Sequence, residues 1–388
     1  MMARVVGGDL LITGTGHDDV LTIERSGARA GDVHLRQNLG ENGPTWHTFT
    51  GVTGDIRIDL GGGDDQVVVR DVRVGRDLRI NSGAGDDHVS LIGTRVRRNV
   101  AIKARVGVDG VAVVGVTTGN QVRVAAGSGN DRVTLNDSTF NGKAYVKGWR
   151  GDDSVALAGS TFRARRFLND GMGKDAIYRT AVEHTYDFGT GDNGWVGGAS
   201  DFHAGLTAEI DAKAEIRQLP AEVGAGTAYY LSGNNFHADD LLVFLKRQLG
   251  PDDGIQPNQS YVAVYDVMVA SNYADTKLYL QVGGGATEPV PVLDDQNYWG
   301  MNVDVADQAN NGRYASIAGV VSNDLSPGES LELGEPYLSV RRRHVHPAPI
   351  RADADGRLWL FLGIDSAVES TVPSYLQSVK VTLVPTAG

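Results

Sequence analysis

The chain has 388 residues, of which 51 are glycine and none is cysteine, and its formal net charge is −12. The length predicts two or three domains, and the lack of cysteine excludes disulfides, cysteine-ligated zinc and thiol nucleophiles. The negative charge argues against nucleic acid as a partner, and no apolar run approaches the ~18 residues of a transmembrane helix. No leader precedes the first strand-like run at Arg4. We therefore expect a mature form, a fragment or a protein exported without an N-terminal signal.

Charge is divided unevenly along the chain. Residues 1–186 hold 24 basic and 22 acidic side chains, whereas residues 187–388 hold 12 basic and 26 acidic ones. Such a change at mid-chain indicates two domains of different character. We expect a β cap with the first turn of a repeat over residues 1–50, a repeat domain over 51–186 and a second domain over 187–388.

A motif rich in glycine and aspartate, G-x-G-x-D-x-(Val/Ile), recurs through the first half. Five copies fit it and two are degenerate: Gly14–Val20, Gly61–Val67, Gly83–Val89, Gly127–Val133, Gly171–Ile177, Arg105–Val111 and Trp149–Val155. From the second copy onward the aspartates are 22 residues apart: Asp65, Asp87, Asp109, Asp131, Asp153 and Asp175. Asp18 precedes Asp65 by 47 residues, which we interpret as two periods plus three extra residues near Glu41–Trp46.

Apolar residues keep the same period. Two positions after the aspartates stand Val67, Val89, Val111, Val133, Val155 and Ile177. Alternating apolar and polar residues predict short strands with one buried face. One such strand cannot bury its face alone, so equal turns must stack, each strand pairing with its equivalent one period later. The repeat therefore predicts a parallel β-helix, with rungs about 4.8 Å apart, and its length favours the right-handed type.

The aspartates of the repeat allow two interpretations. Each side chain can accept N–H bonds within its own corner, as in an Asx turn, or successive corners can offer oxygens to Ca²⁺, which takes 6–8 of them. Carboxylates ~4.8 Å apart repel by about 3–4 kcal/mol at an effective dielectric of ~20. The column therefore needs a cation, amide donors or raised pKa values. The expected calcium ligands are Asp65, Asp87, Asp131 and Asp153, with Asp18, Asp64, Asp86 and Asp152 beside them.

These copies resemble the nonapeptide repeat of RTX (hemolysin-type) calcium-binding proteins. The resemblance covers residues 14–178 and implies a calcium-binding β-helix. Only one motif occurs per period here, whereas that family has tandem nonapeptides. In its period the chain is closer to the β-helical repeats, rich in glycine, asparagine and aspartate, of large secreted or surface proteins of bacteria.

Beyond Tyr186 the period of the repeat stops, and strand-like runs follow at irregular spacing. Turns rich in glycine, proline, aspartate and asparagine separate these runs, which predicts an antiparallel β-sandwich and hence an all-β protein. The runs are Ala228–Leu231, Leu241–Leu245, Tyr261–Ala270, Lys277–Val282, Ala315–Val320, Tyr337–Val340, Leu358–Gly363 and Ser378–Val384.

Several stretches of the second half resemble jelly-roll accessory modules of secreted bacterial proteins, including carbohydrate-binding ones. They are YDFGTGDNGW, PNQSYVAVYDVMVAS and YLQSVKVTLVP, and the resemblance spans residues 187–388. It implies a structural Ca²⁺ near the first and last strands. Asp187 fits the first position, but Ser378 and Lys380 stand where an acid is expected at the second.

Sugar binding would need exposed aromatic rings, because pyranose rings stack on flat π-faces. The candidates are Tyr229, Tyr230, Tyr298, Trp299 and Tyr314. Each of them can equally belong to the core.

Other motifs carry weaker signals. A metal could be held by His237, Asp239 and Asp240, or by His344 and His346, although solvated surface groups are the more common role of such motifs. A basic patch could be formed by Arg95, Arg97, Arg98, Arg163, Arg165 and Arg166. The sequence lacks the motifs of zinc proteases, α/β-hydrolases and phosphate-binding loops.

Together these patterns favour a non-enzymatic secreted or cell-surface protein. A β-helix, calcium-stabilised or purely structural, would act as a rigid spacer and carry a β-sandwich for adhesion or carbohydrate binding. The expected partner is a glycan or another cell-surface or matrix component. The alternative is a polysaccharide lyase or hydrolase acting on acidic glycans, which needs a base beside acids that hold Ca²⁺. The oligomeric state is left open.

Overall fold

The computed structural model describes residues 1–26, 31–38, 44–234, 241–273, 278–307, 311–322, 336–366 and 373–387. The chain divides into two compact units, Met1–Ala181 with Val384–Ala387, and Val182–Leu383. The sequence placed this boundary after residue 186. β23 (Val182–Asp187) instead belongs to the second unit, because it pairs with β37 (Ser374–Thr386).

Antiparallel strands begin the first unit. A hairpin of two strands is followed by a meander of three: β1 (Met2–Val6), β2 (Asp9–Thr13), β3 (Val20–Arg25), β4 (Val33–Asn38) and β5 (Pro44–Phe49). β2 and β3 pair in parallel with β6 (Ile56–Gly62) and β7 (Gln66–Arg70), so that Leu10 lies beside Ile56 and Val20 beside Gln66. The interval before Asp65 is therefore one rung with β4 and β5 inserted, and the prediction of two periods is corrected. Residues 41–43 of the stretch held responsible lie outside the described residues.

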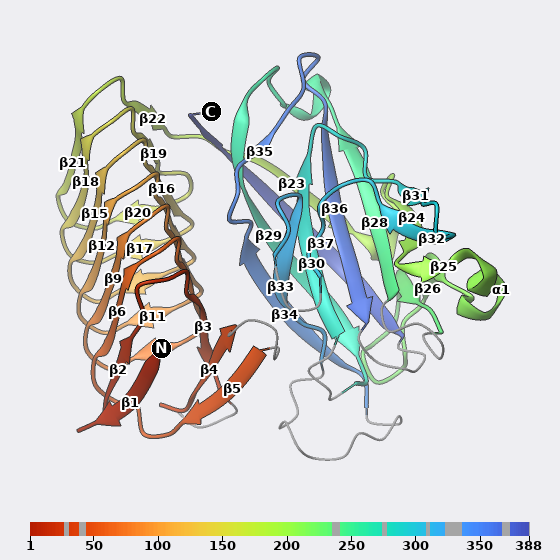
Figure 1. The fold of residues 1–388 in the computed structure, drawn as a ribbon, viewed down its shortest axis with the longest axis horizontal. Coiled ribbons are helices and arrows are strands. Elements are labelled where there is room, and N and C mark those ends of the chain that lie inside the picture. Colours follow the sequence, from red (N-terminus) through yellow and green to blue (C-terminus); the bar gives the residue numbers. More distant parts are fainter. Residues whose placement is uncertain are drawn as a thin grey trace. The chain divides into compact units, whose positions relative to one another are not determined.

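From β6 onward the chain coils as stacked parallel rungs of three strands each (Figure 1). Partners lie one period of the repeat apart, so Val89 pairs with both Val67 and Val111. Sheet I runs from β1 and β2 through β6, β9 (Leu78–Ala84), β12 (Val100–Val106), β15 (Val122–Ser128), β18 (Ala144–Arg150) and β21 (Arg166–Met172).

The other two faces of each rung form sheets II and III. Sheet II joins β5, β4 and β3 to β7, β10 (His88–Ile92), β13 (Gly110–Val114), β16 (Arg132–Asn136), β19 (Ser154–Ala156) and β22 (Ala176–Tyr178). Sheet III holds β8 (Arg73–Val74), β11 (Arg95–Val96), β14 (Thr117–Thr118), β17 (Thr139–Phe140) and β20 (Thr161–Phe162). The predicted parallel β-helix is thus confirmed, with five complete rungs from β6 to β20.

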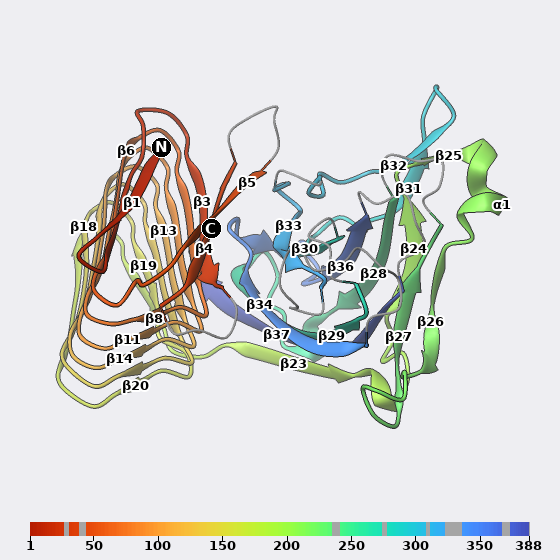
Figure 2. The ribbon, with the colours of Figure 1, turned by 90° about the horizontal axis from the view of Figure 1, so that it is seen from below.

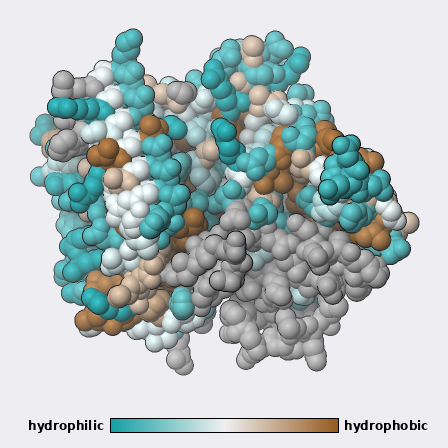
Figure 3. All heavy atoms as spheres, viewed as in Figure 1, coloured by the Kyte–Doolittle hydropathy of each residue, from teal (hydrophilic) through white to brown (hydrophobic). Residues whose placement is uncertain are grey.

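The predicted apolar columns line the inside of this solenoid. In the column that begins at Val67, side chains are buried as far as Val155, whereas Ile177 in the last rung is 39% exposed. Figure 2 shows the rungs nearly end-on, as nested outlines around this interior. On the face shown in Figure 3, hydrophilic residues cover much of the solenoid, with scattered hydrophobic spots between them. Met2 and Val6 of β1 are exposed.

The second unit is built from antiparallel strands, as predicted. Sheet IV holds β26 (Lys213–Gln218), β27 (Thr227–Ser232), β37, β29 (Ser260–Ser271) and β34 (Leu338–Val345), with β23 and β35 (Ile350–Arg351) at its side. Sheet V holds β24 (Val196–Ser200), β28 (Leu241–Leu249), β36 (Leu358–Ser366), β30 (Leu278–Gly285) and β33 (Ala315–Val320). Sheet VI is a small sheet of β25 (Phe202–His203), β32 (Tyr298–Met301) and β31 (Pro291–Leu293), and the one described α-helix is α1 (Thr207–Ile210).

Sheets IV and V share one apolar core, which makes this unit a β-sandwich. Tyr265 of β29 is buried in it with Leu245 of β28 and Leu362 of β36. All eight predicted strand-like runs coincide with strands, except that Tyr337 precedes the start of β34 and Lys277 lies outside the described residues. No helix in the described parts of the chain has the length and apolar character to cross a bilayer.

The rungs stack so closely that a corner glycine is sterically required. Gly129 has φ +134°, and a Cβ there would lie 1.7 Å from the carbonyl oxygen of Gly107, one rung earlier. We predict that Gly129→Ala destabilises the solenoid by roughly 2–4 kcal/mol, because neither backbone can move without breaking the stack. Gly16→Ala is the control, since a Cβ there meets nothing within 4 Å. Urea unfolding followed by circular dichroism measures both variants, and equal midpoints would contradict the prediction.

Candidate functional site

The repeat aspartates stand in one file at the corner between sheets I and II. We call this file the inner ladder: Asp65, Asp87, Asp109, Asp131, Asp153 and Asp175. Each Oδ1 accepts a hydrogen bond from the backbone N–H of the preceding rung, at 2.8 to 2.9 Å. In the first rung the donor is Asp19, so Asp19 rather than Asp18 continues this file. The side chains therefore join neighbouring rungs, instead of closing an Asx turn in their own corner.

A second file beside it points the other way along the axis. This outer ladder holds Asp18, Asp64, Asp86, Asn130 and Asp152. Each Oδ1 accepts the backbone N–H of the next rung, at 2.7 to 2.8 Å. The four aspartates of the outer ladder are exposed to solvent. Adjacent residues thus tie each corner to the rungs on both sides of it.

The inner ladder is buried, and this changes its protonation. Asp65, Asp109 and Asp131 are each 1% exposed, and their Oδ2 atoms have no hydrogen-bond partner among the described residues. Burial raises the pKa of these three carboxyls to about 7, against the lowering effect of the N–H bond from the rung before. Burial likewise raises the pKa of Asp87. Asp65, Asp109 and Asp131 are therefore partly protonated near neutral pH.

Each carboxylate of the inner ladder is bonded to a neighbouring rung through its Oδ1 atom. Ca²⁺ takes 6–8 oxygens, yet no three His, Cys, Asp or Glu side chains in the described parts of the chain are grouped to hold a metal. Each inner carboxylate already accepts an N–H, and so do Asp18, Asp64, Asp86 and Asp152 of the outer ladder. Hydrogen bonds between rungs account for the arrangement of all eight solenoid aspartates that the sequence suggested as calcium ligands.

A third ladder, which sequence reasoning missed, lies at the corner between sheets III and I. The N–H groups of Asp55, Asp77, Asn99 and Gln121 each donate to the side-chain oxygen one rung earlier, beginning at Asp9, at 2.9 to 3.2 Å. The signal was present as a column of acceptor side chains that keeps the period of the repeat.

Arginines neutralise this third ladder. The guanidinium groups of Arg57 and Arg79 lie 2.9 and 2.7 Å from Oδ2 of Asp55. Burial alone would raise the pKa of Asp55, but hydrogen bonds from Arg57, from the Asp77 N–H and from Arg79 outweigh it and lower this pKa to about 2. Asp55 is therefore ionised at a pH where Asp65, Asp109 and Asp131 of the inner ladder are partly protonated.

In the second unit, Tyr229 and Tyr314 belong to the interior. Tyr229 is 5% exposed, and its hydroxyl donates to the carbonyl of Trp195 at 3.2 Å. Tyr314 is 9% exposed, and its hydroxyl donates to the carbonyl of Thr287 at 2.7 Å. Neither ring therefore offers an open face to a sugar, which corrects their choice as candidates.

Tyr298 and Trp299 lie side by side on β32 and are partly exposed. The Tyr298 ring meets the His203 ring edge-on, with centroids 5.2 Å apart, whereas Trp299 packs against the core of the sandwich. Alternation along the strand thus directs the two rings differently, and they do not form one platform.

Tyr230 belongs to a group of aromatic residues that lie far apart in the sequence and meet only in the fold. Tyr229 and Leu231 face the core, so Tyr230 lies on the outer face of sheet IV, directly across from Tyr375 of β37. The two ring centroids are 5.0 Å apart, and the Tyr337 ring stands edge-on to Tyr375 at 5.5 Å. We call Tyr230, Tyr337 and Tyr375 the tyrosine cluster.

Arg217 of β26 completes the rim of the tyrosine cluster. Its guanidinium carbon lies 4.1 Å from the centre of the Tyr230 ring, and its Nε donates to Glu215 at 2.6 Å. Tyr230 is 8% exposed and lies beneath this guanidinium, whereas Tyr337 and Tyr375 are half-buried and present the accessible rings of the cluster. Burial raises the pKa of Tyr337 to about 12, so its hydroxyl remains a neutral donor and acceptor.

The two weak metal motifs have different outcomes. His237, Asp239 and Asp240 lie outside the described residues. His344 of β34 and His346, just after the end of that strand, are buried. They share one partner, because the Ser316 hydroxyl lies 2.8 Å from Nε2 of His344 and 2.7 Å from Nδ1 of His346. This pair holds a core serine rather than presenting nitrogens to a metal.

Asp187 occupies the expected place near the first and last strands of the sandwich. Its backbone pairs with Ser378 of β37. Its Oδ1 accepts the N–H of Gly189 at 2.8 Å and so caps a short turn, while Lys380 pairs with Glu183 at 3.1 Å. The last strand supplies no acid beside Asp187, as the sequence indicated.

Comparison with known proteins adds little to this picture. No family model and no curated protein match the chain, so the RTX resemblance finds no support there. The enzymatically active domain of tailspike protein 4 of bacteriophage CBA120 is 9% identical with a TM-score of 0.26, over 84% of this chain and 60% of that domain.

Two further solved structures are similar to about half of the chain. The K3 cleaved adhesin domain of Lys-gingipain from Porphyromonas gingivalis is 10% identical with a TM-score of 0.26, over 53% of this chain and 98% of that domain. The C-terminal family 22 carbohydrate-binding module of Clostridium thermocellum Xyn10B is 13% identical with a TM-score of 0.23, over 52% of this chain and 92% of that module. At these TM-scores the likenesses carry no argument, so the function must be argued from the chain's own residues.

We predict that the solenoid loses stability as the pH rises from about 4 to 7. Between these values the native Asp65, Asp109 and Asp131 hold protons that the unfolded aspartates have already released. The free energy of unfolding therefore falls by about 1.4 kcal/mol per pH unit for each such proton. Asp109→Asn keeps an Oδ1 acceptor for the Asp87 N–H but cannot ionise. We expect it to reduce the difference between the melting temperatures at pH 5 and pH 8. Wild-type melting that stays constant or rises across this range would refute the protonated ladder.

Proposed function

We propose that the protein is a carbohydrate-binding protein of the cell surface or extracellular space. The second unit binds the sugar through the tyrosine cluster, and the solenoid acts as a rigid spacer. The observation that carries this proposal is the meeting of the half-buried Tyr337 and Tyr375 rings on the outer face of sheet IV, packed on the buried Tyr230 ring and beside Arg217.

The chemistry of the tyrosine cluster suits a neutral sugar ring. Pyranose C–H groups stack on aromatic faces, and the tyrosine hydroxyls sit beside them as hydrogen-bond partners. Arg217 and Glu215 at the rim add donors and acceptors for sugar hydroxyls. Small-molecule sites are usually preformed and combine aromatic or apolar surface with a small number of polar groups that orient the ligand. The proposal is for binding without turnover, and a lyase or hydrolase activity on acidic glycans is its alternative.

We predict that Tyr375→Ala and Tyr337→Ala each weaken glycan binding about tenfold or more, because each truncation removes a ring from the cluster. A glycan array identifies the ligand, and isothermal titration measures its affinity for each variant. Tyr298→Ala, which truncates a partly exposed ring on β32, should leave the affinity unchanged. If only Tyr298→Ala reduces binding, the sugar site lies on β32 and the tyrosine cluster is not the site. Release of unsaturated sugars from the ligand would favour the lyase.

Calcium binding stays a prediction of the RTX-like repeat. At a free Ca²⁺ concentration of about 100 times the Kd, a single site would add ~2.7 kcal/mol to the free energy of unfolding. The bonded arrangement of the inner and outer ladders leads us to expect the same melting temperature with about 5 mM Ca²⁺, a concentration above the Kd of the weakest known extracellular sites, and with a chelator. Thermal melts of the full chain measure this, and Mg²⁺ serves as the control. A rise specific to Ca²⁺ would establish calcium as a stabilising ligand.

A further inference from the structure

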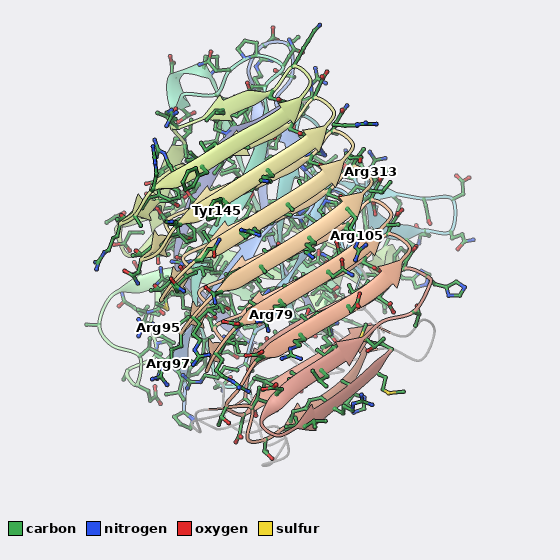
Figure 4. The ribbon with its side chains drawn as sticks, turned by 90° about the vertical axis from the view of Figure 1, so that its left-hand side faces the viewer. Arg79, Arg95, Arg97, Arg105, Tyr145 and Arg313 are labelled. Atoms are coloured by element: carbon green, nitrogen blue, oxygen red, sulfur yellow. The ribbon has the colours of Figure 1, made fainter. Side chains whose placement is uncertain are left out.

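Four arginines gather where sheet III turns into sheet I. Arg73 and Arg95 are paired on adjacent rungs, on β8 and β11. Arg97 and Arg98 follow in the next turn, where their N–H groups bond to the carbonyls of Val74 and Arg76 at 3.1 and 3.0 Å. All four side chains are exposed, and Figure 4 shows Arg95 and Arg97 close together at one edge of sheet I. We call Arg73, Arg95, Arg97 and Arg98 the arginine corner.

The arginine corner lacks the counter-charges that neighbouring arginines have. Arg57, Arg76 and Arg79 form ion pairs with the acids of the third ladder. By contrast, no residue of the arginine corner forms an ion pair with any described residue. Like charges directly across a strand pair are destabilising, so Arg73 beside Arg95 costs stability in the free protein.

The solenoid does not need these charges to fold. Later rungs place neutral residues in the same columns, with Thr117 and Thr139 following Arg73 and Arg95. One rung after Arg97 and Arg98 stand Gly119 and Asn120, which keep the same backbone hydrogen bonds. An unfavourable cluster that the repeat can dispense with indicates a ligand outside the chain.

We propose that the arginine corner binds an acidic polysaccharide through its carboxylate or sulfate groups. Guanidinium groups present planar donor pairs that match both oxyanions. Rungs about 4.8 Å apart repeat those donors along the solenoid axis, as a linear polymer repeats its charges. The interaction is electrostatic and local, since the exposed aspartates of the outer ladder lie on another corner of the same rungs.

Single-stranded nucleic acid is the competing polyanion, and the solenoid surface argues against it. Such chains bind by stacking bases on aromatic faces beside cations. On sheet I, Tyr145 and Phe167 stack on one another with centroids 4.7 Å apart and an interplanar angle of 6°. The guanidinium groups of Arg123 and Arg165 lie over these rings, 5.1 and 5.4 Å from their centres. These rings lie on β18 and β21, three or more rungs beyond β11, so they do not stand beside the arginine corner, although Phe167 is 36% exposed.

This site is independent of the tyrosine cluster. It lies in the first unit and recognises charge, whereas the tyrosine cluster lies in the second unit and recognises sugar faces. Variants of Tyr375 should therefore bind acidic polymers as wild type does. A result that contradicts one of the two proposals does not affect the other.

Binding to polygalacturonate, which carries carboxylates, and to heparin, which carries sulfates, tests the proposal on the full chain. Two double variants, R73T/R95T and R97N/R98N, introduce residues that occur at the same column positions in other rungs. We expect wild type to bind at least one polymer with an affinity that falls as salt rises, and each double variant to bind it about tenfold or more weakly. Circular dichroism and melting temperature check that each variant folds.

The control R351T/R357T removes two exposed positive charges from the second unit and should bind like wild type. Neutral dextran and single-stranded and duplex DNA complete the comparison. The proposal is overturned if wild type binds neither acidic polymer, if the control weakens binding as much as the arginine-corner variants, or if either DNA binds more tightly than both polysaccharides. Selective binding to one of the two polymers would identify carboxylate or sulfate as the recognised group.

Discussion

The structure of the first unit depends on hydrogen bonds from corner N–H groups to side chains one rung away. At a corner the strands end, and the backbone N–H groups there lose their sheet partners. Asp87 supplies an acceptor to the rung before it, and Asp86 supplies one to the rung after it. Because each acceptor must lie opposite its donor, every rung must have the same number of residues between corners. The period of the repeat is constant in the sequence because of this geometric requirement.

The three ladders solve the same hydrogen-bonding problem with different electrostatics. In the inner ladder the buried Asp65, Asp109 and Asp131 hold protons near neutral pH. The aspartates of the outer ladder are exposed, and the acids of the third ladder pair with arginines. The arginine corner is the contrasting case, since its charges are compensated neither by protons nor by described acids. The exposed aspartates of the outer ladder also form no ion pair with described residues, but their charge is negative. The arginine corner is therefore the place among these where an anionic ligand can bind.

Along the strands of sheet IV, side chains alternate between the core, where they stabilise the sandwich, and the outer face, where they can contact a ligand. Tyr229 and Leu376 face the core, whereas their neighbours Tyr230 and Tyr375 face outward on the same two strands. The rings of the outer face meet only because β27 and β37, which lie far apart in the sequence, are adjacent in sheet IV. In the same way, His344 and His346 both lie within hydrogen-bond distance of the buried Ser316 hydroxyl. The H-x-H spacing in the sequence does not reveal this shared partner.

The sequence by itself determined the fold of the first unit, because a solenoid makes each contact at one fixed separation and the period of the repeat reports it directly. Val67, Val89 and Val111 could therefore be placed in the core, and the repeat aspartates in one file, without coordinates. It misjudged the first rung, since the meander of β4 and β5 interrupts the period and leaves no periodic trace. Tertiary structure alone decided which rung each carboxylate bonds to, and which tyrosines converge on sheet IV. Both depend on side-chain direction and on strands that pair at irregular separations, and no local pattern encodes either of them.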